Sequence, residues 1–303
     1  MNKLVQLTKR NCLVYIKDKS AVFFSLLSML VVLLLMYFFL GNMNVDYITD
    51  LQNTYGGVRD SAADLENANY LVQYWTLAGL MVVNSLTVTL TVVGTLVTDR
   101  NGNKLKSFYT APVSRLLVAL SYILSAIIVG FVLCMVVFVL YMGFIYRMGG
   151  QILPLAAIGK VMAGTLLSVV LFSLLTYLLA LFVKSSSAWG GVATIAGTFV
   201  GFLGAIYVPV GSLPEGVTGV LKSLPVLHAA SIMRKFMCED ALNATFAGVP
   251  EEVTKVYRQV MGIDLLWKET VLSTELQFLF LAGCGMIILL AIALCGRKHS
   301  SLA

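Results

Sequence analysis

Charged residues are scarce in this chain of 303 residues. Asp, Glu, Lys and Arg together make up 12% of it, whereas hydrophobic residues make up 59%. Soluble domains are about a quarter charged and about half apolar, so this composition excludes an ordinary soluble domain. The mean hydropathy of +0.89 points the same way. We therefore expect an integral membrane protein.

Cysteine and histidine are too few, and too scattered, to build a reactive centre. The five cysteines show no C-x-x-C spacing, and no two of them lie in one loop that we expect to be external. This pattern speaks against a disulfide scaffold and against a zinc site. His228 and His299 have no second ligand at metal-binding spacing and no nucleophile set nearby. We predict no catalytic residue and no metal site.

An energy source is also missing from the sequence. The phosphate-binding string G-x-x-x-x-G-K-[ST] does not occur, and the nearest fragment, Gly159-Lys160-Val161, lacks the first glycine and the hydroxyl residue. The apolar runs hold no Asp, Glu, His or Arg that could relay protons or sodium, although sodium sites can be built from hydroxyls and carbonyls alone. We predict no cofactor in this chain and expect the driving energy to come from a partner.

Long apolar runs are abundant. A helix crosses the hydrocarbon layer in about 20 residues. Six runs of at least that length predict six transmembrane helices, at about 21–40, 70–97, 116–146, 155–183, 188–208 and 276–295. Five carry no charged residue, and Lys160 in the fourth lies near enough to its start to reach the interface. The predicted fold class is an all-α polytopic membrane protein.

The flanks of these runs predict the orientation. One set of flanks, which includes both termini, holds 12 Lys and Arg and two Asp, so its net charge is +10 against −4 for the other set. Because cytoplasmic loops carry the excess of Lys and Arg, both termini are predicted to be cytoplasmic. This placement also explains the net charge of +6 without nucleic acid as a partner. Residues 1–19 are too long and amphipathic for a removable signal peptide, so the first run is predicted to be retained.

The segments outside the spans predict further helices. Most apolar residues of 1–19 fall on one half of a helical wheel and most cations on the other, with Asn11 and Leu13 breaking the pattern. This favours an interfacial helix on the inner leaflet, while a solvated basic start remains open. Residues 41–69 predict a polar cap. Within 209–275 we predict an external region in which a short apolar helix pair re-enters the outer leaflet, followed by exposed helix from Cys238.

Two motifs resemble those of the type-2 ATP-binding-cassette (ABC) exporter permeases. The loop TDRNGNKLKSFYTAPVSRLLVA, residues 98–119, matches in Asp99, Arg100, Gly102, Leu105, Pro112, Val113 and Arg115. The stretch YVPVGSLPEGVTGVLKSLPVLHAASIMRKF, residues 207–236, matches in Pro209, Leu213, Pro214, Leu224, Pro225 and Arg234. The resemblance covers essentially the whole chain. The prolines and the arginine of the second motif can also simply shape and cap the outer helices.

The resemblance implies a single exporter transmembrane domain over 1–303, which pairs with a second permease chain and with cytoplasmic ABC ATPase subunits that bind ATP and Mg²⁺. Residues 99–112 would then hold the coupling helix that docks on the ATPase, and 184–187 a smaller second contact. The implied coupling residues are Asp99, Arg100, Gly102, Leu105, Phe108, Tyr109 and Pro112. Alternatively, the cations of this loop only set the topology.

Two helical stripes predict a substrate path or a dimer interface. Asn84, Thr87, Thr91 and Thr95 share one face of the second run, and Thr194, Gly197 and Gly201 share one face of the fifth. Hydroxyls gain nothing from facing lipid, and glycines allow close approach of another helix. Packing without a transport role remains open for both stripes.

These observations lead to one functional prediction and one alternative. The prediction is the permease subunit of an ATP-driven exporter in a bacterial plasma membrane, which moves an apolar or amphipathic substrate such as a drug, antibiotic, peptide or lipid by alternating access. The absence of a cationic cluster along either stripe makes a strongly anionic polymer a less suitable cargo. The alternative is a partner-independent channel or scaffold, in which the same stripes form a static pore or a packing seam.

Overall fold

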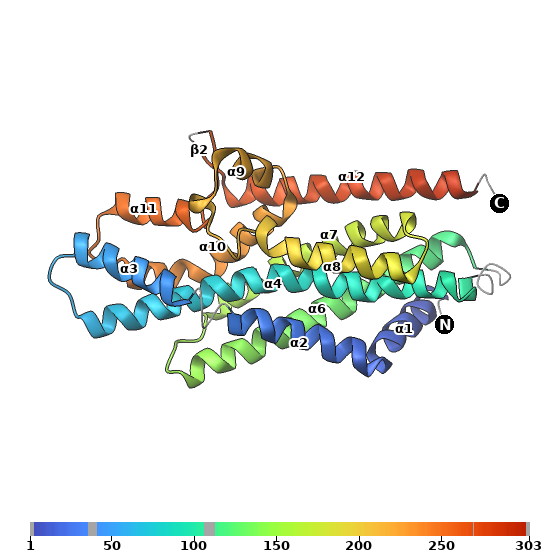
Figure 1. The fold of residues 1–303 in the computed structure, drawn as a ribbon, viewed down its shortest axis with the longest axis horizontal. Helices are drawn as coiled ribbons and strands as arrows, with labels where there is room; N and C mark the ends of the chain where they lie inside the picture. The colour runs from blue at the N-terminus through green and yellow to red at the C-terminus, as the bar shows by residue number, and fades with distance from the viewer. Residues whose placement is uncertain (1–2, 36–40, 106–112, 269, 301–303) are drawn as a thin grey trace.

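The computed structural model describes residues 3–35, 41–105, 113–268 and 270–300, and it is an elongated bundle of helices (Figure 1). The long helix α4 (Ser61–Asn101) runs along the middle and has its most extensive contacts with four other helices. These are α6 (Arg115–Arg147), α7 (Leu155–Phe182), α8 (Ser186–Leu203) and α10 (Pro225–Thr245). The N-terminal helix α1 (Lys3–Lys17) and the far end of α12 (Thr274–Ser300) lie at the same end of the bundle.

The remaining elements are short. They are α2 (Lys19–Leu35), α3 (Gly41–Tyr55), the 3-10 turn η2 (Val210–Ser212), α9 (Glu215–Lys222), α11 (Glu251–Val260), and the strands β1 (Leu266–Trp267) and β2 (Thr270–Val271). The two strands pair antiparallel, with Leu266 opposite Val271.

Among the described residues, five helices are long and apolar enough to cross a membrane, namely α4, α6, α7, α8 and the part of α12 that ends at Cys295. The number rises to six if the bent pair α9 and α10 is counted as one span. Helix α2 covers the first part of the predicted span 21–40, and the rest of that span lies outside the described residues. The chain is therefore an all-α polytopic membrane protein, as its composition predicts.

Two helix ends differ from the predicted spans. Helix α4 begins at Ser61 rather than Tyr70, because the Asp60 carboxylate caps its N-terminus and accepts hydrogen bonds from Ala62 N and Ala63 N. Helix α8 ends at Leu203 rather than Val208. There the chain turns back, with Ala205 in the left-handed region at φ 48° and Ile206 N donating to Gly201 O.

The N-terminus of α4 is fastened to the end of α10. Arg59 makes a two-pronged ion pair with Asp64, with both N···O distances at 2.7 Å. The same guanidinium donates to the carbonyl of Thr245, which also accepts a hydrogen bond of 2.7 Å from Gln52 Nε2. The hydrogen bond with Asp64 raises the pKa of Arg59 above its ordinary value. The predicted polar cap 41–69 is thus packed against the outer helices.

The helices from Cys238 onward are exposed on one face and buried on the other, so the expectation of exposed helix there holds in part: Glu239, Asp240, Glu251 and Glu252 are exposed. Cys238 and Leu242 are buried, and Tyr257 on α11 is fully buried as well. The buried face of α10 packs on α4 and α7. Helix α9 meets α10 at 86°, a geometry that fits either a broken span or a re-entrant loop.

Arg234 holds this outer region together. Its side chain is fully buried and donates to the carbonyls of Gly204, Ala205 and Gly262, while its guanidinium lies 4.6 Å from the centre of the Trp75 ring. Carbonyl groups and an aromatic face are suitable partners for a buried guanidinium. The arginine of the second motif therefore joins the turn after α8 to the segment after α11, in agreement with the capping alternative.

Candidate coupling site and hydroxyl-lined groove

The last turn of α4 carries a buried carboxylate. Asp99 is 1% exposed and accepts hydrogen bonds from both terminal nitrogens of Arg10 on α1 and, at 2.7 Å, from the Tyr122 hydroxyl on α6. Lys104 Nζ lies 3.7 Å from the Asp99 carboxylate. A buried charge is tolerated only when it is paired and hydrogen-bonded. Asp99 therefore joins α4, α1 and α6 at one point.

Helix α1 docks on the bundle through the polar residues beside this ion pair. Asn11, which breaks the amphipathic pattern, is 2% exposed and donates to Ser121 Oγ on α6 at 3.1 Å. Arg10 donates to Asn11 Oδ1 at 2.9 Å, and Tyr15 on the same face donates to Ser25 of α2. The hydrogen bond with Asp99 raises the pKa of Arg10 above its ordinary value. This face of α1 is held by specific side-chain contacts and not by lipid alone.

The next residue, Arg100, links α4 to the end of α7. Its guanidinium donates to Ala180 O and Val183 O, at 3.0 Å each. Asn101 bonds the Ser186 hydroxyl at the start of α8. The start of the segment 99–112 is thus a neighbour of the segment 184–187, the two segments that the resemblance implies as ATPase contacts.

The remaining implied coupling residues are described only in part. Gly102 ends α4, with its N–H donating to Thr98 O at 2.9 Å, and Leu105 is 7% exposed. Phe108, Tyr109 and Pro112 lie outside the described residues. Sequence reasoning named Asp99 and Arg100 but missed Arg10 and Tyr122. These residues are distant in the sequence and come together only in the folded protein.

A groove of about 460 Å³ lies between α4 and α8. Of the residues on the two predicted stripes, Asn84, Thr87 and Thr91 line it from α4, and Thr194 and Gly197 line it from α8. Its other lining residues are Val83, Leu90, Ala193, Thr198 and Tyr207. The two stripes lie far apart in the sequence, yet they face each other across one groove.

Two stripe residues fall outside the lining. The Thr95 hydroxyl donates to Val92 O within α4. Gly201 is covered by the ring of Tyr207, because a Cβ at Gly201 would come within 2.1 Å of that ring. Tyr207 was missed by sequence reasoning, since it follows the end of α8 and reaches the groove only because the chain turns back there.

Hydrogen bonding inside the helices fixes which polar atoms the groove offers. The hydroxyls of Thr91, Thr194 and Thr198 each donate to the carbonyl four residues earlier, at 2.9 to 3.0 Å. Their remaining lone pairs can accept hydrogen bonds from a ligand. Asn84 is 1% exposed, and its Nδ2 has no hydrogen-bond partner among the described residues. The lining carries no charged side chain, so it suits a neutral or amphipathic ligand with hydroxyl or amine groups.

A tryptophan pins α8 beside this groove. Trp189 is buried, and its indole N–H donates to Leu90 O on α4 at 3.2 Å. A Cβ at Gly94 would lie 2.5 Å from the same indole nitrogen, so this helix crossing requires a glycine. The width of the groove therefore depends on the Gly94–Trp189 contact.

No group of three His, Cys, Asp or Glu side chains in the described part of the chain is arranged to hold a metal ion. His228 is buried, and its Nε2 lies 2.8 Å from Lys222 O, where it fastens α10 to the end of α9.

The fold defines a polytopic membrane protein in which the start of the loop after α4 is tied to neighbouring helices and α4 and α8 border a groove. The family model for the ABC-2 type transporter matches residues 2–238, and the chain belongs to this family. Comparison with curated proteins finds no match. Membership makes the chain the membrane permease subunit of an ABC transporter, a transport subunit whose ATPase generally lies in a separate subunit.

Proposed function

We propose that this permease is an exporter subunit that moves an amphipathic substrate out of the cell by alternating access, driven by a partner that hydrolyses ATP. The observation that carries the proposal is the anchoring of the 99–112 loop. Asp99 ties its start to α1 and α6, and Arg100 ties it to the end of α7. A push on this loop would therefore move several helices as one body.

The same push would reach the groove. Thr91 lies about two helical turns from Asp99 on α4, since a turn holds 3.6 residues. Because α8 is pinned to α4 through Trp189 and Leu90, a tilt of α4 changes how the two helices meet along the groove. We assign Asn84, Thr87, Thr91, Thr194 and Gly197 to the substrate path.

A second permease chain would complete the path. Thr194 and Thr198 are exposed on α8, and exposed hydroxyls gain little from lipid. A second copy, or a related chain, that packs on this face of α8 would cover them. We also infer that both termini are cytoplasmic. Helix α1 and the far end of α12 lie at the same end of the bundle (Figure 1), and the excess of Lys and Arg in the flanks at the termini supports the cytoplasmic side for that end.

The test is affinity purification of the tagged chain in mild detergent, with identification of co-purifying proteins and an ATPase assay. We expect a stoichiometric partner that bears the phosphate-binding motif and hydrolyses ATP. A variant with Gly102, Leu105 and Phe108 changed to Ala should elute as the wild type does but lose stimulation of the partner ATPase. The matched control is Leu155→Ala, an 84% exposed position at the opposite end of α7. Unchanged transport by the triple variant would refute the coupling role and favour a channel or scaffold.

A further inference from the structure

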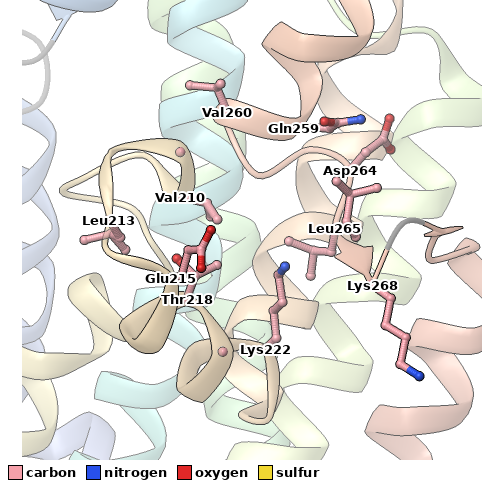
Figure 2. A pocket seen from close by; sticks show the side chains of 13 residues that line it. Val210, Leu213, Glu215, Thr218, Lys222, Gln259, Val260, Asp264, Leu265 and Lys268 are labelled. Carbon is pink, nitrogen blue, oxygen red and sulfur yellow. The ribbon is translucent and has the colours of Figure 1, made fainter.

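A second cavity, of about 480 Å³, lies in the region 209–275 (Figure 2). Its walls come from η2, α9, the end of α11 and the segment that leads into β1. This volume is within the range of small-molecule sites, about 300 to 1,000 Å³. The groove between α4 and α8 shares no lining residue with it, so the two cavities are distinct.

One wall of this outer pocket is apolar. Val210 and Leu265 belong to a small hydrophobic cluster that is separate from the main core, and Leu213 packs against that cluster. Val260 and Leu266 add further apolar lining. The pocket therefore offers carbon-rich surface to a ligand.

Charges of both signs line the rest. Glu215 begins α9 and Lys222 ends it, and Figure 2 shows the Lys222 side chain reaching into the space between Glu215 and the Asp264–Leu265 segment. Lys268 also lines the pocket, and its side chain points away from Lys222.

One of these charges is already compensated by the protein. Asp264 pairs with Arg258 at 2.6 Å and with Lys235 at 3.6 Å. Glu215 and Lys222 form no ion pair within 4.0 Å in the described part of the chain. Lys268 forms no such ion pair either, so the pocket holds one open carboxylate and two open ammonium groups, of which only Lys222 reaches into the space beside Glu215.

Exposed apolar side chains surround the pocket, and they favour a position at the edge of the membrane. Trp267, which follows the lining residue Leu266, is 56% exposed, and exposed tryptophans collect at the membrane–water interface. Val217 and Val220 on α9 are exposed, at 45% and 61%. Leu279 in the second turn of α12 is 67% exposed, as expected of a lipid-facing helix. We therefore expect the pocket to lie where lipid headgroups meet acyl chains.

We propose that the outer pocket binds the headgroup of an aminophospholipid, a lipid with a phosphodiester and a primary ammonium. The phosphate lies on Lys222, the ammonium lies on Glu215, and the glycerol and first methylene groups lie on Val210, Leu213 and Leu265. Opposite charges at the two ends of α9 match a zwitterion, and the apolar wall matches the carbons next to the phosphate. This binding site goes beyond the proposed transport function and does not depend on a partner ATPase.

The experiment measures lipid binding to the purified full chain in detergent, from the saturable shift of its melting temperature. The probes are dihexanoyl phosphatidylethanolamine, dihexanoyl phosphatidylglycerol and glycerophosphoethanolamine. We expect the first to bind at least about tenfold more tightly than the second, because a charge-assisted hydrogen bond contributes that much. Lys222→Gln and Glu215→Gln should each weaken binding of phosphatidylethanolamine at least about tenfold.

Matched controls lie on the exposed face of α11. Lys255→Gln and Glu252→Gln remove the same charges outside the pocket, and both should bind phosphatidylethanolamine as the wild type does. Lys222→Arg keeps the positive charge and should bind phosphatidylethanolamine as the wild type does. Melting temperatures without lipid check that each variant is folded, and Glu215 is exposed enough that its substitution disturbs no packing.

Three results would overturn the proposal. Wild-type binding by both Lys222→Gln and Glu215→Gln would mean that lipid does not occupy this pocket. Equal binding of phosphatidylglycerol, with no effect of Glu215→Gln, would mean that the ammonium is not recognised. Equal binding of glycerophosphoethanolamine would mean that the site takes a soluble phosphodiester and not a lipid.

Discussion

The ion pair between Arg10 and Asp99 can be removed by substituting either residue. The two substitutions should lower the free energy of unfolding by different amounts. Arg10→Met leaves a buried carboxylate with only Tyr122 and Lys104 as partners. Breaking a fully buried pair costs about 3 to 5 kcal/mol. Because the Arg10 side chain is 29% exposed, water screens part of the interaction, and we expect a loss of about 2 kcal/mol.

The opposite change should cost less. Asp99→Asn leaves a guanidinium that can turn toward water, so we expect about 1 kcal/mol. In the double variant no unpaired carboxylate remains. Its free energy of unfolding should therefore fall by less than the sum of the two single decreases, by about 1 kcal/mol or more. The assay is unfolding by SDS titration in mixed micelles, followed by circular dichroism.

The same variants test coupling. If Asp99 transmits the push of the loop, Asp99→Asn should lower the stimulation of the partner ATPase even where the protein is folded. The matched control is Asp64→Asn, which breaks a two-pronged Arg–Asp pair at the other end of α4 and should leave ATPase stimulation unchanged. Additive losses in the double variant would refute the pairing, and equal ATPase effects of Asp99→Asn and Asp64→Asn would refute a specific role in coupling.

Three further predictions concern the groove and the outer helices. Gly197→Leu should fill the groove and abolish transport, whereas Gly143→Leu on an exposed face of α6 should not, and a transport assay that finds both variants active would remove the groove from the path. Gly94→Ala should displace the Trp189 indole, and its fluorescence should report a changed environment; an unaltered spectrum would contradict the close contact. Arg234→Leu should lower the free energy of unfolding, measured by SDS titration, by about 3 kcal/mol or more, because three carbonyls lose their donors. Arg234→Lys should restore little of it, and a wild-type free energy of unfolding for Arg234→Leu would contradict this role.

The span pattern is the part that could be predicted from the sequence. An uncharged run of 20 residues has few alternatives to a membrane helix, because lipid offers no partner to free backbone groups. The predicted runs at 116–146 and 155–183 correspond to α6 and α7 within a few residues. Helix ends were predicted less well, as at Asp60 and Gly204, because a cap or a left-handed residue moves the boundary.

The candidate groove was predicted in part. The period of 3.6 residues placed Thr87 and Thr91 on one face of their helix, and the same was true of Thr194 and Gly197. Nothing in that period says that the two faces meet, and the stripe could not include Tyr207, which enters from the turn after α8.

Asn11, Asp99 and Arg234 show which features the sequence alone does not determine. Hydrophobicity acts through the local chain and the bilayer, so the sequence by itself determined that this is a helical membrane protein with several crossings. Pairing of polar groups acts over distances that the chain must fold to close. Only the tertiary structure decided that Asn11 faces Ser121, that Asp99 is held by Arg10 and that Arg234 caps carbonyls, since each partner lies at least 28 residues away.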